Sequence, residues 1–172
     1  MTDSLLPEDI VTLAAEVIAA NAAQGRKVAL AESCTGGLVA AALTEIAGSS
    51  AVLDRGFVTY SNESKQGLLG VPDGIIDTFG AVSIACAWAM AQGALKASNA
   101  DVAVAISGVA GPDGGTAQKP VGLVVFARAV RGSDAIEAEE RCFDARGRAD
   151  VRRQATRVAL ELLLPGSSIS GD

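Results

Sequence analysis

The sequence predicts a single α/β domain, a three-layer α/β/α sandwich around a mixed, mainly parallel sheet. Short apolar runs with strand character alternate with segments whose apolar residues recur at helical spacing. Two β-rich runs joined by "RGSD" indicate an antiparallel hairpin that is added to the parallel part. The 172 residues, 49% of them hydrophobic and 20% charged, suit one domain with a continuous core.

The first half of the chain predicts three helices and two strands. Ile10, Ala14 and Val17 recur at helical spacing, and an alanine-rich run indicates a second, smaller helix. The strands are the buried-looking "KVALAE" and the β-forming "AVLDRGFVTYS". "NESKQGLLG" predicts a short helix that Asn62 caps, followed by a turn at "VPDG". In chain order, these elements are expected at 7–25, 27–32, 36–47, 51–61 and 62–70.

The second half predicts two more helices and three strands. Ser83 is expected to cap a helix of small residues, and "DVAVAIS" has the clearest buried-strand character. "VGLVVFARAV" and "AIEAEERCF" form the hairpin, and the last helix ends before Pro165. We expect one domain over residues 1–164 and a flexible tail over 165–172. The elements are expected at 83–97, 101–107, 121–130, 135–143 and 148–164.

The composition disfavours several classes of protein. The net charge is −6, the pI is about 4.7, and no basic run is longer than Arg152–Arg153, so we expect no nucleic-acid partner. No apolar run approaches the ~20 residues of a membrane-spanning helix, and the acidic N-terminal stretch does not read as a secretory signal. The three cysteines lack CxxC spacing. We therefore expect Cys34, Cys86 and Cys142 to be reduced thiols in the core of a cytoplasmic protein.

The chain contains no histidine. This excludes Ser-His-Asp and Cys-His catalysis within the chain, and also zinc sites with histidine ligands. No group of carboxylates has convincing metal-ligand spacing, so we expect no metal and no cofactor. An enzyme built from this chain must use another base.

One stretch, "ALAESCTGGLVAAAL", breaks its apolar pattern with five small or polar residues, Ser33 to Gly37. Such glycines allow a strand to turn sharply into a helix, whose unpaired N–H groups stabilise an anion. A serine hydroxyl in front of them can attack a carbonyl group while N–H groups near Gly36 and Gly37 receive the oxyanion. The alternative is that Ser33 or Thr35 merely caps the helix.

The stretch "YSNESK" offers a base for such a serine. Tyr60 is expected at a strand end and Lys65 in the first turns of a short helix. Without histidine, a serine nucleophile needs a lysine or tyrosine partner. A lysine acts as a base only where burial lowers its pKa from about 10.4 to roughly 7–8. The alternative is an ordinary exposed lysine on a helix.

The loop "SGVAGPDGGTAQKPVG" follows the clearest buried strand and carries closely spaced glycines. Such a backbone is typical of a loop whose amides converge on an anion such as phosphate. It matches neither the Walker A pattern nor GxGxxG, so it predicts neither ATP nor a dinucleotide. Ligands of open α/β sheets bind beyond the carboxyl ends of the strands. We therefore expect the active crevice between this loop and Ser33.

The motifs "AESCTGGLVA", "FVTYSNESKQGLLGV", "GAVS" and "ISGVAGPDGGTAQKPVGLV" resemble, in the same order, those of the CinA C-terminal domain family, the nicotinamide-nucleotide amidohydrolases. The resemblance extends over residues 7–164. It implies metal-independent hydrolysis of nicotinamide mononucleotide to nicotinate mononucleotide and ammonia, a step of pyridine nucleotide salvage. It also implies that Ser33 is the nucleophile, with Lys65 and Tyr60 as its proton-transfer partners.

The expected substrate-binding residues lie in the two glycine-rich loops and at the start of the last helix. They are Thr35, Gly36, Gly37, Ser107, Gly108, Gly111, Gly114, Gly115, Thr116 and Arg148. The "GDR" pattern that often precedes the last helix in the family reads Arg146-Gly147-Arg148 here, without the acidic residue. We expect a small-molecule nucleotide substrate, no membrane partner, and a homo-oligomer, because alanine-rich helices pack closely.

Two other functions stay open at this point. A nucleotide-binding regulatory module without turnover would use the same glycine-rich loops but would not need Lys65. An amidase of another small carboxamide would need Ser33 and Lys65 but no phosphate site.

Overall fold

The computed structural model describes residues 4–144 and 146–169. The predicted helices and strands are all present, and one further helix lies between two of them. The elements are α1 (Glu8–Ala23), β1 (Val28–Glu32), α2 (Leu38–Thr44), the 3-10 turn η1 (Ser49–Ala51), β2 (Leu53–Val58), α3 (Asn62–Leu69), α4 (Asp73–Phe79), α5 (Ile84–Lys96), β3 (Val102–Gly108), β4 (Leu123–Val130), β5 (Glu137–Cys142) and α6 (Arg148–Leu163).

The five strands form one mixed sheet in the order β2-β1-β3-β4-β5. Strand β1 runs parallel to both β2 and β3, whereas β4 is antiparallel to β3 and to β5. The mixed sheet and the C-terminal hairpin are thus confirmed. Because β1 and β3 are parallel neighbours, their carboxyl ends meet at one edge, where the Ser33 N–H donates to the Ile106 carbonyl at 2.9 Å.

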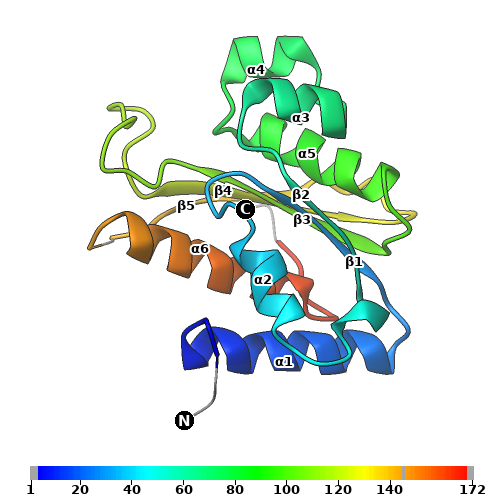
Figure 1. The fold of residues 1–172 in the computed structure, drawn as a ribbon. Helices are drawn as coiled ribbons and strands as arrows, with labels where there is room; N and C mark the ends of the chain where they lie inside the picture. The colour runs from blue at the N-terminus through cyan, green and yellow to red at the C-terminus, as the bar shows by residue number, and fades with distance from the viewer. Residues whose placement is uncertain (1–3, 145, 170–172) are drawn as a thin grey trace.

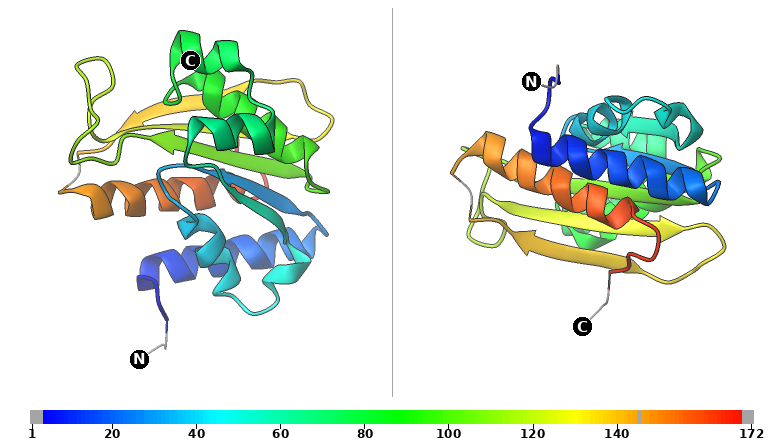
Figure 2. Two further views of the ribbon diagram at one scale, coloured as in Figure 1. Left: turned by 45° about the horizontal axis from the view of Figure 1, so that its top comes forward. Right: turned by 90° about the horizontal axis from the view of Figure 1, so that it is seen from below.

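Helices cover both faces of the sheet, which confirms the three-layer sandwich (Figures 1 and 2). Helices α1, α2 and α6 pack on one face over a core that contains Leu30, and α5 packs on the other over a core that contains Ala31. Side chains alternate between the faces along a strand. The same alternation directs Glu32 toward α2 and Ser33 toward α3, so two adjacent polar residues serve opposite sides of the sheet.

The structure differs from the sequence-based expectations around α3. The predicted turn "VPDG" instead begins α4: Pro72 is its N-cap and Asp73 lies in its first turn, where a carboxylate favours the helix. The N-cap of α3 is Ser61 and not Asn62. Ser61 and Ser64 exchange reciprocal side-chain-to-backbone hydrogen bonds of 3.0 and 3.1 Å, and this capping box decides between two good capping residues.

Two features near the C-terminus also differ from the expectations. Cys34 and Cys86 are buried as expected, but Cys142 is exposed, because it lies at the end of the edge strand β5. Of the expected flexible tail, residues 165–169 make defined contacts: Ile169 is buried and its N–H donates to Glu137, which also pairs with Arg128. The rest of that tail, 170–172, lies outside the described residues.

Candidate active site

Ser33 and Lys65 meet at the carboxyl end of β1. The Lys65 Nζ lies 3.2 Å from the Ser33 Oγ and donates to the Thr59 carbonyl at 2.8 Å. Ser33 follows the last residue of β1, and the N-terminal half of α3 brings Lys65 across from beyond β2. A neutral amine that donates one N–H to Thr59 can direct its lone pair at the serine hydroxyl. This is the arrangement that a serine activated by an amine requires.

Lys65 is buried without a carboxylate beside it. Its side chain is among the largest fully buried ones, and the residue is 1% exposed. Among the ion pairs of residues 4–144 and 146–169, none includes Lys65. Burial penalises the ammonium form and lowers the pKa of Lys65 below its usual value, and the acidic groups Cys86, Cys34 and Glu63 oppose this only in part. The site therefore shifts the protonation equilibrium of Lys65 toward the free amine.

The first turn of α2 is occupied by the carboxylate of Glu32. This residue is 1% exposed, and its oxygens accept from the N–H groups of Gly37, Val39 and Ala40 at 2.9 to 3.2 Å. The Gly36 N–H donates to the Ser33 carbonyl. Contrary to expectation, the N–H groups of Gly36 and Gly37 are thus already engaged within the chain and are not free for an oxyanion.

Glu32→Gln should destabilise the fold. The substitution keeps the shape but replaces charge-assisted hydrogen bonds with neutral ones and turns an NH₂ group toward backbone donors. We expect the free energy of unfolding to fall by about 2 kcal/mol, the typical worth of a hydrogen bond to a charged group. Urea unfolding measures this, with Glu140→Gln on the exposed side of β5 as the control. Equal stability of the two variants would contradict the structural role of Glu32.

Tyr60 follows Thr59, whose carbonyl Lys65 contacts, and it is itself in contact with Arg148. Its side chain is largely exposed, and its hydroxyl accepts from the Arg148 guanidinium at 2.9 Å. Arg148 also donates to the Gly111 carbonyl at 2.8 Å. The first residue of α6 therefore joins the exit of β2 to the glycine-rich loop, and Tyr60 has its hydrogen bond with Arg148 and none with Ser33 or Lys65.

The glycine-rich loop divides into a packed stem and an exposed tip. In the stem, the Ser107 hydroxyl donates to the Ala81 carbonyl at 2.7 Å, and a side chain at Gly108 would collide with β4. The tip carries Gly114, Gly115 and Thr116, and it extends beyond the end of the sheet (Figures 1 and 2). The structure thus brings the stem to the β1 edge, while the tip is exposed to solvent.

Two side chains beside Ser33 are closed off from solvent. Burial raises the pKa of the Cys34 thiol to about 11, so this cysteine stays protonated and unreactive at neutral pH. The Thr35 hydroxyl oxygen is buried and finds no hydrogen-bond partner among the described residues. Neither side chain replaces Ser33 as a nucleophile.

The described part of the chain contains no group of three or more histidine, cysteine or carboxylate side chains that could hold a metal ion. Within the same residues, no helix combines the length and the apolar character needed to cross a membrane.

The sequence and the fold match known proteins over almost the whole length of this chain. The family model described as the CinA C-terminal domain matches residues 10–165. The chain belongs to this CinA family. An Escherichia coli protein named nicotinamide-nucleotide amidohydrolase PncC is 52% identical over 163 residues, which are 95% of each chain. A CinA-like protein of Mycolicibacterium vanbaalenii is 49% identical over 94% of this chain but only 36% of its own length.

Solved structures of CinA proteins share the fold. The crystal structure of the competence/damage inducible protein CihA from Agrobacterium tumefaciens superposes with a TM-score of 0.90 at 52% identity, covering 93% of this chain and 96% of that one. A CinA superfamily protein from E. coli gives a TM-score of 0.84 at 33% identity, covering 93% and 92%. The mixed α/β/α fold of this chain is therefore that of the CinA family.

Two residues that contact the backbone around Ser33, Glu32 and Arg152, are not among the site residues predicted from the sequence. Glu32 ends a strand of otherwise apolar and buried residues, and a charged residue in that place was itself a signal for a local partner. Arg152 lies one turn beyond Arg148 on α6 and donates to the Cys34 and Thr35 carbonyls. Nothing in the spacing of the arginines distinguishes Arg152 from Arg153, which pairs with Asp9 on the surface.

Proposed function

We propose that this chain is a nicotinamide-nucleotide amidohydrolase that converts nicotinamide mononucleotide and water to nicotinate mononucleotide and ammonia. The observation that carries the proposal is the 3.2 Å contact between the Ser33 hydroxyl and a buried lysine without an ion-pair partner. The kinship with amidohydrolases named PncC supports the substrate. A regulatory module that only binds nucleotides has no use for such a pair.

The first half of the reaction forms an acyl-enzyme. Neutral Lys65 takes the proton of Ser33 as Oγ attacks the carboxamide carbon, and the carbonyl oxygen becomes an oxyanion. The tetrahedral intermediate collapses, the C–N bond breaks, and the protonated Lys65 returns its proton to the departing nitrogen. Ammonia leaves and the nicotinoyl ester of Ser33 remains. We assign this proton to Lys65 and not to Tyr60, because Tyr60 has its hydrogen bond with Arg148.

The second half releases the acid. Lys65, neutral again, takes a proton from water while the water oxygen attacks the ester carbon. Collapse of this second intermediate breaks the bond to Ser33, Lys65 returns the proton to Oγ, and nicotinate mononucleotide leaves. A single group thus accepts and returns a proton twice, and it can do so because its pKa is held below the ordinary lysine value.

The phosphate of the substrate is assigned to the place where Arg148 contacts the glycine-rich loop. Arg148 carries a positive charge there, and the glycine-rich loop supplies backbone N–H groups next to it. Of the expected binding residues, Gly111 contacts Arg148 directly, whereas Gly114, Gly115 and Thr116 in the tip must approach a ligand from outside. We also propose that the protein works in the cytoplasm as a homo-oligomer.

A comparison of three substrates tests the proposed function. Ammonia release is followed over time with purified protein, a chelator, and either nicotinamide mononucleotide, nicotinamide riboside or free nicotinamide. We expect kcat/KM to be at least 10²-fold higher for the mononucleotide, since charge-assisted hydrogen bonds to a phosphate are worth about 1.5–3 kcal/mol each. Equal rates for all three would indicate a different amidase, and binding without any turnover would indicate a regulatory module.

A further inference from the structure

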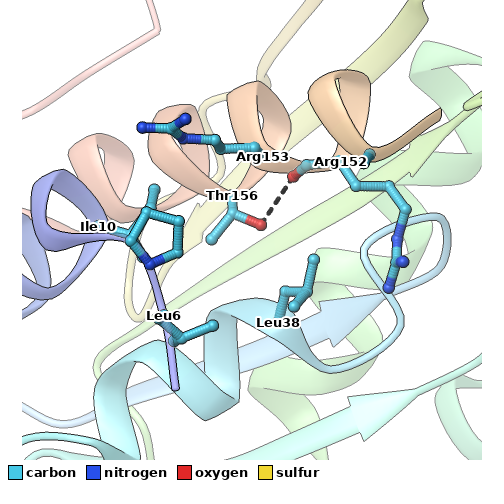
Figure 3. A pocket seen from close by; sticks show the side chains of 8 residues that line it. Leu6, Ile10, Leu38, Arg152, Arg153 and Thr156 are labelled. Atoms are coloured by element: carbon cyan, nitrogen blue, oxygen red, sulfur yellow. Dashed lines mark hydrogen bonds between the residues drawn. The ribbon is translucent and has the colours of Figure 1, made fainter. Parts of the chain in front are cut away.

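Arg152 contacts the backbone immediately after Ser33, on the side of the sheet opposite Lys65. Its Nε donates to the Cys34 carbonyl at 3.1 Å and its terminal nitrogen to the Thr35 carbonyl at 3.2 Å. The residue comes from the second turn of α6, and it also lines an apolar cavity of about 300 Å³ between α1, α2 and α6. Figure 3 shows Arg152 and Arg153 leaving α6 in opposite directions.

The bond to the Cys34 carbonyl fixes the orientation of the Cys34–Thr35 peptide group, and the bond to the Thr35 carbonyl fixes that of the next peptide group. In a trans peptide the C=O and N–H bonds point in opposite directions, and the only cis bond in the described chain precedes Pro112. Arg152 holds the Cys34 carbonyl on the α6 side, so the N–H of Thr35 is directed away from α6. Ser33 and Lys65 lie on that other side.

The other N–H groups near Ser33 are already used. Glu32 accepts from the first turn of α2, and the Ser33 carbonyl accepts from Gly36. Within residues 4–144 and 146–169, the N–H groups of Cys34 and Thr35 donate to no oxygen or nitrogen.

From this arrangement, and on the basis of the proposed function, we propose that Arg152 is a positioning residue of the amide hydrolysis. It holds the Cys34–Thr35 peptide so that the N–H group of Thr35 receives the oxyanion. The guanidinium charge on the carbonyl side also polarises the peptide and strengthens its N–H as a donor. Arg152 itself touches no reacting atom.

Kinetics of Arg152→Gln test this role, with Arg153→Gln as the matched control. Arg153 is the next residue of the same helix, but its guanidinium pairs with Asp9 on the surface. We expect kcat for nicotinamide mononucleotide to fall about 10²-fold in Arg152→Gln, because a displaced oxyanion donor costs on that order. KM should change by less than about threefold, and Arg153→Gln should match the wild type. Unchanged kcat in Arg152→Gln would overturn the proposal.

A second measurement tests the role of Arg152 independently of the identity of the substrate. A fluorophosphonate phosphonylates Ser33: the bond from Oγ to phosphorus forms, the P–F bond breaks, fluoride leaves, and the proton passes through Lys65 to solvent. We expect labelling of Arg152→Gln to be at least tenfold slower than that of Arg153→Gln. Labelling at equal rates would overturn the role of Arg152. Wild-type protein that is labelled but releases no ammonia would overturn the proposed function alone.

Rescue distinguishes positioning from folding. In Arg152→Ala, added guanidinium at tens of millimolar should restore kcat at least fivefold, because the small cation can occupy the vacated place between the two carbonyls. Arg152→Lys, which keeps the charge but cannot span both carbonyls, should lie between Arg152→Gln and the wild type and serves where the alanine variant does not fold. An absence of rescue in folded Arg152→Ala, together with wild-type kcat in Arg152→Lys, would overturn the proposal.

Discussion

Ser33→Ala should abolish the release of ammonia from nicotinamide mononucleotide, with kcat lowered by at least about 10³-fold. The substitution removes the hydroxyl oxygen that lies 3.2 Å from the Lys65 Nζ, and the nicotinoyl ester can no longer form. The fold should persist, since a small side chain at the end of β1 is replaced by a smaller one. Coupled ammonia detection measures the rate, and Ser50→Ala on the exposed η1 turn is the control.

The same variant decides between Ser33 and its neighbour. If Cys34 were the nucleophile, Ser33→Ala would keep its turnover and iodoacetamide would inactivate the wild-type protein. We expect the opposite in both experiments, because the Cys34 thiol has a pKa raised to about 11 and is 5% exposed. Wild-type turnover in Ser33→Ala would therefore contradict the mechanism as a whole, whatever its effect on stability.

Much of this fold follows from local patterns in the sequence. The alternation of apolar strands with helical periodicity predicts the order of the elements, and Ser83 caps α5 as expected, accepting from the Cys86 N–H. Boundaries agree closely where an apolar run ends sharply, as at β3. These patterns suffice to predict the fold class, because a chain with such alternating elements has few ways to bury its apolar surfaces.

Other features could not be predicted from the sequence, because one local pattern is compatible with two different structures. A proline followed by an acidic residue marks a turn and equally the start of a helix, so "VPDG" could not distinguish them, and the burial of Ile76 in α4 decided the outcome. Similarly, the helix N-terminus after Ser33 was expected to hold an oxyanion. The preceding residue, Glu32, supplies a permanent anion to that same position. The spacing of the glycines alone does not show whether a ligand or a carboxylate of the chain occupies this helix N-terminus.

The pairing of Ser33 with Lys65 was the inference that most required tertiary structure. The two residues lie on different elements, and an amphipathic reading of "NESKQGLLG" leaves Lys65 either buried or exposed. The structure buries it, because α3 packs against α5 and the lysine faces the β1 edge. A buried, unpaired lysine is costly for the fold, and such a cost is typical of functional sites.

Lys65→Met tests the catalytic role of Lys65 separately from the energetic cost of burying it. Methionine fills nearly the same volume without an amine, so kcat should fall by about 10³- to 10⁴-fold, the upper range for a general acid-base, since Lys65 serves in both proton transfers. Lys96→Met, at an exposed position in the last turn of α5, is the control and should keep wild-type rates. A loss of less than tenfold in Lys65→Met would exclude Lys65 as the base.

The difference in stability between the wild type and Lys65→Met should depend on pH, and its sign follows from the direction of the Lys65 pKa shift. Burial lowers the pKa in the folded state, so between that lowered pKa and about 10.5 the unfolded chain binds more protons than the folded one. The free energy of unfolding contributed by Lys65 therefore rises with pH across this window. Relative to the wild type, Lys65→Met should gain stability as the pH is lowered, and urea unfolding at several pH values measures the difference.

The pH dependence of activity and the pH dependence of stability should then both reflect the titration of Lys65. Wild-type kcat/KM is expected to fall toward acid pH as Lys65 becomes protonated. The fall should occur over the same pH range in which the difference in unfolding free energy between the wild type and Lys65→Met stops changing with pH. A serine activated by an exposed, ordinary lysine would instead lose activity near the usual lysine pKa and show no linked change in stability. Agreement of the two titrations at a pH well below 10.5 would assign both to the single amine that the fold buries beside Ser33.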